Sequence, residues 1–140
     1  MKILIRAVGK LRDRRMEELC REYLDRVKRH LPVEIEEVTG DDQLTRQLPA
    51  GAEVIALEPG GEAWSTDDFV RFLSERMVRG ARAVVFLIGG ADGLGAGAVA
   101  RAQRRLSLSA LTLPHRLARV ILCEQLYRCT SAIRGEPYNR

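Results

Sequence analysis

The chain has 140 residues, of which 46% are hydrophobic and 30% are charged, and its formal net charge is +4. This length favours a single domain over residues 1–140, with a core large enough to fold without a disulfide or a structural metal. No apolar run approaches the ~20 residues of a membrane span, and the first residues do not resemble a secretion signal, so we expect a cytoplasmic protein with no membrane partner.

The first part of the chain alternates predicted strands and helices. Residues 2–8 are typical of a strand, and residues 12–31 carry apolar side chains at the 3.6-residue spacing of an amphipathic helix. Pro32 ends that helix. A second strand is predicted over 33–38 and a short helix over 41–48.

The middle of the chain continues this alternation. A third strand is predicted over 53–57 and a loop over 58–64, before a helix that Ser65 or Thr66 caps. Residues 83–88 are continuously apolar, which indicates a strand buried on both faces, as in a parallel sheet.

The last third completes the pattern. A short helix is predicted over 98–105, a fifth strand over 106–113, and a long helix over 116–133, after Pro114. Strands that alternate with helices predict an α/β fold, with a mostly parallel sheet and helices on both faces.

The long last helix carries apolar residues on more than one face. A helix that rests on a sheet needs only one apolar stripe. We therefore expect a second copy of the chain to cover it, which predicts a homodimer through this helix.

Cysteine and arginine usage limits the chemistry. Cys20, Cys123 and Cys129 lie in apolar helical patterns, which favours buried thiols. The sequence has only two histidines and no spacing typical of zinc ligands, so we expect no metal.

Residues 98–140 hold eight Arg and two acidic residues, whereas 1–97 hold 15 basic and 17 acidic residues. This asymmetry fits either a nucleic-acid partner or a solvated basic face.

A glycine-rich segment, 89–97, follows the buried strand 83–88. Ligands of open α/β sheets bind beyond the carboxyl ends of strands, and glycine lets a ligand approach the backbone closely. A tight strand-to-helix turn would have the same composition. Residues 93–98 also fit a dinucleotide-binding pattern, but the first glycine of that pattern comes five residues after Ile88 and no acidic residue lies between Asp92 and Glu124.

Residues 106–113 read Leu-Ser-Leu-Ser-Ala-Leu-Thr-Leu. They are either a core strand whose hydroxyls are bonded locally or a pocket wall. In the second case, backbone groups would read an adenine edge while leucines sandwich the ring.

Several blocks together resemble one family. They are residues 87–94, residues 106–115 and the pair Tyr127-Arg128, with support from the two ends of the chain. They are similar to the bacterial 23S ribosomal RNA pseudouridine N3-methyltransferases, the large-subunit methyltransferase H family of the SPOUT superfamily. The resemblance spans the chain, although the region around 40–52 is shorter than usual.

The resemblance implies a C-terminal trefoil (α/β) knot that binds S-adenosylmethionine. It also implies a homodimer that methylates N3 of a pseudouridine in 23S ribosomal RNA, on the assembled ribosome. By matching position, the cofactor site would comprise Leu57, Gly89, Gly90, Gly93, Leu108, Ser109, Ala110, Leu111, Thr112 and Leu113.

The tail departs from the family pattern. The family usually ends in Pro-Tyr-His and a basic residue, whereas residues 137–140 read Pro-Tyr-Asn-Arg, and Asn139 cannot act as a base. We predict that Tyr138 stacks on the substrate and that Arg140 and Arg128 stabilise the deprotonated imide. His115 is an alternative base.

Two other functions remain open. A non-catalytic RNA- or ribosome-binding factor of the same fold is one, because Asn139 weakens the catalytic interpretation. A nucleotide-binding enzyme of another class is the other, although the sequence lacks a Walker lysine.

Overall fold

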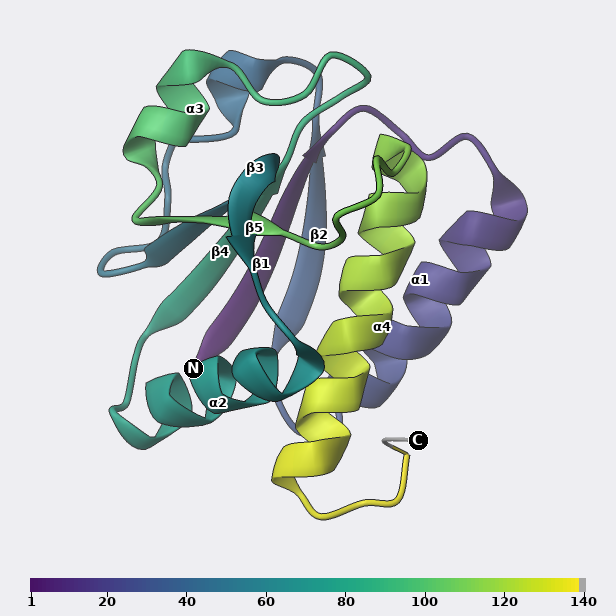
Figure 1. The fold of residues 1–140 in the computed structure, drawn as a ribbon, viewed down its shortest axis with the longest axis vertical. Helices are drawn as coiled ribbons and strands as arrows, with labels where there is room; N and C mark the ends of the chain where they lie inside the picture. The colour runs from purple at the N-terminus through teal and green to yellow at the C-terminus, as the bar shows by residue number, and fades with distance from the viewer. Residues whose placement is uncertain (139–140) are drawn as a thin grey trace.

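A five-stranded sheet in the order β2-β1-β4-β3-β5 forms the centre of the computed structural model, which describes residues 1–138 (Figure 1). Every neighbouring pair of strands is parallel, as predicted. The strands are β1 (Lys2–Val8), β2 (Val33–Val38), β3 (Glu53–Ala63), β4 (Ala83–Ile88) and β5 (Arg104–Ser107).

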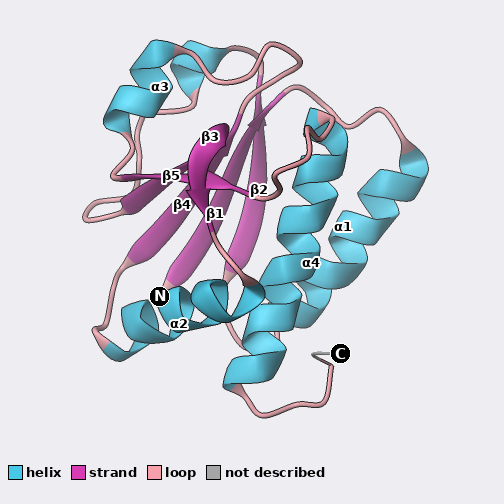
Figure 2. Ribbon diagram, viewed as in Figure 1, coloured by secondary structure: helices cyan, strands magenta, loops and turns pink. Residues whose placement is uncertain are grey.

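Helices cover both faces of the sheet, but unequally (Figure 2). The three longer helices pack on one face: α1 (Arg14–Val27), α2 (Thr66–Val78) and α4 (His115–Ile133). The short 3-10 helix η1 (Asp41–Gln43) and α3 (Ala96–Arg101) lie on the other. The prediction of helices on both faces is confirmed.

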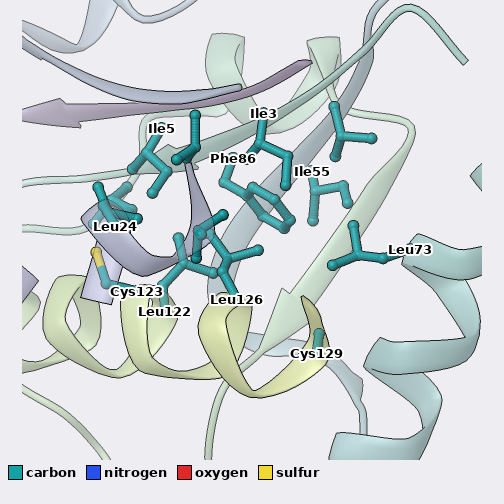
Figure 3. Close-up of a cluster of buried hydrophobic side chains, with 14 of the residues drawn as sticks. Ile3, Ile5, Leu24, Ile55, Leu73, Phe86, Leu122, Cys123, Leu126 and Cys129 are labelled. Carbon is teal, nitrogen blue, oxygen red and sulfur yellow. The ribbon is translucent and has the colours of Figure 1, made fainter. Parts of the chain in front are cut away.

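The core follows the two-residue period of the strands. Ile3 and Ile5 of β1 point toward α1 and α4 (Figure 3), whereas Leu4 between them packs with Val85 and Leu87 on the opposite face. All six residues of β4 are buried, as its apolar sequence predicts. Each fully buried side chain of this size stabilises the fold by about 1.5–3 kcal/mol.

The predicted loop 58–64 is wrong in most of its length, because β3 continues to Ala63. The pairing of β3 with β5 shifts register between Leu57 and Glu62, so the strand bulges there. Gly61 allows the two backbones to meet, since a Cβ on it would lie 2.6 Å from the carbonyl carbon of Arg105. Only the pairing with β5 reveals this extension.

The predicted strand 106–113 is also wrong beyond Ser107. The Ser107 hydroxyl donates to the carbonyl of Ser109 (2.8 Å), and the Leu111 amide donates to the Ser109 hydroxyl (2.9 Å). Such local side-chain bonds compete with strand pairing and turn the chain away from the sheet.

Helix boundaries differ from prediction at several ends. The first helix begins at Arg14, capped by Asp13, and ends at Val27, while α3 ends at Arg101 and the region 41–48 forms only the 3-10 turn η1. The Ser65 cap is confirmed, and its capping box with Asp68 is complete.

Three other expectations concern the whole chain. Within the part of the chain that is described, no helix combines the length and apolar character needed to cross a membrane. The single domain and the C-terminal knot stay predictions.

Candidate functional site

A pocket of ≈ 740 Å³ lies where the bulge of β3 and the carboxyl ends of β4 and β5 meet the N-terminal end of α4. Because parallel strands end at the same edge of a sheet, segments that are distant in sequence converge there. The pocket is lined by residues 57–59, 88–94, 106–109, 111–115 and 118. Figure 1 shows the loops after β4 and β5 approaching the first turn of α4.

The glycine segment forms one wall by folding back on itself. A Cβ on Gly89 would lie 2.7 Å from the amide nitrogen of Leu94 and would also overlap the backbone of Gly93. The Gly93 amide donates to the Gly90 carbonyl (3.0 Å), and Gly93 has a φ of +77°. Glycine is therefore required here, and the wall presents backbone to the pocket.

Asp41 fixes the far end of this segment. The amide of Gly95, the residue that caps α3, donates to Asp41 Oδ1 (3.0 Å). A Cβ on Gly95 would lie 2.5 Å from Asp41 Oδ2, so a side chain at this position would have to displace the carboxylate. No sequence pattern signals this role, because Asp41 lies 54 residues away in the chain.

The opposite wall is the turn that follows β5. All residues predicted to contact the cofactor line the pocket except Ala110, which is exposed to solvent. The Ser107 and Ser109 hydroxyls are bonded within the turn, as predicted, whereas the interpretation as a core strand is wrong beyond Ser107. Leu111 is 76% exposed, an unusual position for a large apolar side chain at a pocket mouth.

The charges of the pocket favour a cationic ligand. Among the described lining residues, the charged side chains are Glu58 and Asp92, and no Lys or Arg contributes to the wall. Arg105 pairs with Glu58 at 3.1 Å. A pyrophosphate would meet carboxylates without a lining cation, which argues against a dinucleotide.

The predicted catalytic residues lie elsewhere. The Tyr138 ring packs on Tyr127, with centroids 4.4 Å apart, and the Arg128 guanidinium lies 4.9 Å from the Tyr138 centroid. Ala118 lines the pocket ten residues before Arg128, which corresponds to about 15 Å along a helix. The structure does not bring the tail to the pocket within one chain. Arg140, like Asn139, lies outside the described residues.

Burial and neighbouring charges set the protonation states of Tyr138 and Arg128. Burial raises the pKa of the Tyr138 phenol, and the negative charge of Glu124 adds to this, so the hydroxyl is a neutral donor near pH 7. Arg128 Nε donates to Glu124 at 2.7 Å, and this bond raises the pKa of the guanidinium. His115, the alternative base, is the first residue of α4 and lines the pocket.

The C-terminal arginines do not form one free basic face. Arg104 pairs with Glu53 (3.3 Å), Arg105 pairs with Glu58, and the buried Arg119 pairs with Glu37. The excess of arginine therefore supports the fold in part, which composition could not show.

The cysteines are buried and unpaired, as predicted. Within residues 1–138, no group of His, Cys, Asp and Glu side chains is arranged to hold a metal ion.

Comparisons with known proteins agree with this geometry. A family described as "Predicted SPOUT methyltransferase" matches residues 1–139. The chain is 44% identical over 143 residues to a ribosomal RNA large subunit methyltransferase H of Sorangium cellulosum, covering 99% of both chains. It is 40% identical over 151 residues to the protein of that name from Rhodospirillum rubrum, covering 100% of this chain and 99% of the other.

One solved structure supports the fold alone. It is a protein of Bordetella pertussis Tohama I described as a probable methyltransferase, with a TM-score of 0.59 and 10% sequence identity. The alignment covers 91% of this chain and 95% of that one.

Proposed function

The chain belongs to the SPOUT methyltransferase family, and from that premise we propose that it transfers a methyl group from S-adenosylmethionine to N3 of a pseudouridine in 23S ribosomal RNA. The observation that carries the proposal is the pocket at the carboxyl edge of the sheet, walled by the glycine segment and the turn after β5. Assembled ribosomes are the proposed substrate.

The residues of the pocket fit this cofactor. When bound, S-adenosylmethionine supplies a methyl group on a positively charged sulfur. Asp92 adds a negative charge to the pocket wall that suits such a cation, whereas Arg105 partly balances the charge of Glu58. Leu57, Leu108 and Leu113 offer apolar surface for an adenine ring, and the backbone around Gly89 allows close approach.

The protein has two tasks in the reaction. It must hold the donor and the base nitrogen in line, and such orientation contributes roughly 7–11 kcal/mol. It must also favour loss of the imide proton, which titrates roughly two units above neutral pH and so costs about 3 kcal/mol. A guanidinium near the imide offsets this cost by stabilising the anion.

Arg128 and Arg140 are the proposed guanidinium donors, and Tyr138 is the proposed stacking platform. In the described residues Arg128 already contacts Glu124 and the Tyr138 ring, so this charge is held in place rather than mobile. Asn139 leaves the tail without a histidine base. The tail therefore positions and polarises the substrate.

The distance between tail and pocket supports a dimer. A pocket at the N-terminal end of α4 and a tail beyond its C-terminal end come together when two α4 helices pack antiparallel, because each end then meets the opposite end of its partner. We propose that one copy supplies the pocket and the other supplies Tyr138.

The surface of α4 partly supports this arrangement. The sheet, α1 and α2 already bury much of its apolar circumference, including Leu122, Cys123 and Leu126. Leu117 remains 40% exposed and Ile121 is half-buried. The proposed interface is therefore the solvent-facing side of α4, and sedimentation equilibrium at micromolar concentration would show a dimer.

The test of function is methyl transfer from labelled cofactor to ribosomes of a strain that lacks this gene. We expect label in 23S ribosomal RNA, mapped by mass to one pseudouridine. Calorimetry should show S-adenosylmethionine binding. Label in no RNA fraction would exclude the proposed reaction.

A second candidate is favoured by Asn139. A non-catalytic ribosome-binding factor of the same fold would bind ribosomes, yet show no methyl transfer and no affinity for S-adenosylmethionine. The same two measurements therefore separate the candidates.

A further inference from the structure

The segment that follows β1 is strongly basic and is not explained by the cofactor pocket. Residues 10–15, here called the basic loop, read Lys-Leu-Arg-Asp-Arg-Arg. Lys10, Arg12, Arg14 and Arg15 are all exposed. Of these four, only Arg15 forms an ion pair among the described residues, at 3.4 Å from Asp13.

The basic loop lies beside the pocket. β1 and β4 are neighbouring parallel strands, so the chain leaving β1 emerges next to the glycine segment that leaves β4. Val8 Cγ1 would be 3.4 Å from a Cβ on Gly90, a lining residue, and Arg119 Nη2 donates to the Gly9 carbonyl at 2.9 Å. Figure 1 shows the segment after β1 passing the first turn of α4.

The basic loop departs from two local preferences, one of backbone conformation and one of charge placement. Arg12 has a φ of 56°, a left-handed conformation that costs a non-glycine residue free energy. Arg14 and Arg15 occupy the first turn of α1, where the helix dipole disfavours positive charge. Local conflicts of this kind are expected at functional surfaces.

The loop is nevertheless anchored. Leu11 is buried within it, and Asp13 caps α1 by accepting from the amides of Arg15 and Met16. The basic side chains therefore extend from a fixed backbone, and ordering them on a ligand requires no refolding of the loop.

We propose that the basic loop binds the phosphate backbone of the RNA substrate beside the pocket, an inference that rests on the proposed function. The carboxylates of the pocket suit a cation, while the rim formed by the basic loop suits a polyanion. The loop contains no aromatic residue. Its contacts thus set the position and affinity of the RNA and carry little sequence preference.

The test compares two variants that remove equal charge. Lys10→Gln/Arg14→Gln changes the basic loop, and Arg79→Gln/Arg82→Gln changes two exposed residues just before β4, at the opposite edge of the sheet. Binding of labelled, deproteinised 23S ribosomal RNA is followed at several salt concentrations. Calorimetry measures S-adenosylmethionine affinity for both variants.

We expect the loop variant to bind RNA about tenfold more weakly. Its salt-dependence slope should be smaller by about two, because two cationic side chains no longer neutralise phosphates. The control variant should stay within about twofold of wild type. Both should bind S-adenosylmethionine as wild type does. Equal RNA affinity of the two variants overturns the proposal.

Arg12 gives a second, independent readout. Arg12→Gly removes the charge and relieves the left-handed strain, so it should melt at or above the wild-type temperature while RNA affinity falls several-fold. Arg12→Lys keeps the charge and should retain RNA affinity. A glycine variant that binds RNA as wild type does contradicts a role for the Arg12 charge.

The outcomes separate this inference from the proposed function. If wild type binds and uses S-adenosylmethionine but the loop variant keeps its RNA affinity, only the present inference fails. If wild type has no cofactor affinity, the methyltransferase proposal fails while the RNA comparison still decides the role of the loop. If the loop variant loses binding to ribosomes but not to deproteinised RNA, the loop docks on protein and the RNA assignment is wrong.

Discussion

Individual residues shape the pocket through the space that they leave and the backbone that they fix. Gly89 has no side chain, and the turn that follows it occupies the volume where a Cβ would lie. Asp41 holds the amide of Gly95 in place by accepting its hydrogen bond. Sequence patterns indicated Gly89, because a glycine-rich segment after a buried strand is a recognisable signal. They could not indicate Asp41, whose role depends on the contact between η1 and the start of α3.

Gly89→Ala should abolish cofactor binding. The added methyl group would overlap the backbone of Gly93 and Leu94, so the wall must shift, and overpacking of this kind costs about 1–3 kcal/mol of stability. Calorimetry should show a loss of S-adenosylmethionine affinity of at least tenfold. Gly97→Ala is the matched control, since a Cβ there meets nothing within 4 Å.

Asp41→Ala should weaken the cofactor site from outside it. The amide of Gly95 loses a charged acceptor, an interaction worth roughly 1.5–3 kcal/mol, so the glycine segment becomes looser. We expect the dissociation constant for S-adenosylmethionine to rise about tenfold.

Asp41→Asn retains an acceptor oxygen and should restore most of that affinity. Asp42→Ala, which removes an exposed neighbouring carboxylate paired with Arg46, should have little effect. Equal affinities of Asp41→Ala and wild type would show that the glycine segment holds its shape unaided.

At the scale of elements, the sequence predicted the strands and helices whose apolar residues recur with a regular period. The strands β1, β2 and β4 match their predicted ranges, and the period of α1 placed Cys20, Leu24 and Val27 on its buried face, although Leu19 of the same apolar pattern is 41% exposed. The errors concern segments whose state depends on distant partners. β3 continues to Ala63 because β5 pairs with it, and the chain after Ser107 leaves the sheet because serine hydroxyls bond the backbone.

Three elements meet at Glu53, the first residue of β3. Arg76 from α2 binds both of its carboxylate oxygens, at 2.8 and 3.2 Å, and Arg104 from β5 adds a bond at 3.3 Å. The hydrogen bond from Arg76 is the main cause that lowers the pKa of Glu53 below its ordinary value of 4.5. The group therefore stabilises the fold fully above pH 4.5, and this contribution is lost as the pH falls through its folded pKa.

Glu53→Gln should accordingly lower the free energy of unfolding near pH 7 by about 1–3 kcal/mol, because it removes the carboxylate that accepts two hydrogen bonds from Arg76 and leaves that guanidinium only the exposed Glu75 at 3.4 Å. The difference from wild type should shrink below about pH 4.5, as wild type itself becomes protonated. Urea unfolding at pH 7 and pH 3 measures both values. Glu18→Gln removes an exposed carboxylate with no ion pair in the described residues, and it should show no such pH-dependent difference.

At the scale of the whole molecule, the two parts of the proposed active site lie apart in one chain. Its pocket and its tail lie at opposite ends of α4, separated by about 15 Å of helix. The charges are divided as well, with carboxylates in the pocket and a basic loop at the rim. A dimer with antiparallel α4 helices would place a tail, a pocket and two phosphate-binding rims on one continuous surface.

This arrangement predicts that two inactive variants complement each other. Gly89→Ala disables the pocket, and Tyr138→Ala disables the tail, so each homodimer should be inactive. When the two are unfolded together and refolded as a mixture, half of the dimers are mixed, and each mixed dimer has one intact pocket facing one intact tail. Methyl transfer should return to about a quarter of the wild-type rate.

The control refolds each variant alone and then combines them at low temperature, where subunits do not exchange. It should give no activity. If the mixture also stays inactive while mass spectrometry shows mixed dimers, each tail serves the pocket of its own chain, and the tail must then move by about 15 Å along α4 to reach it.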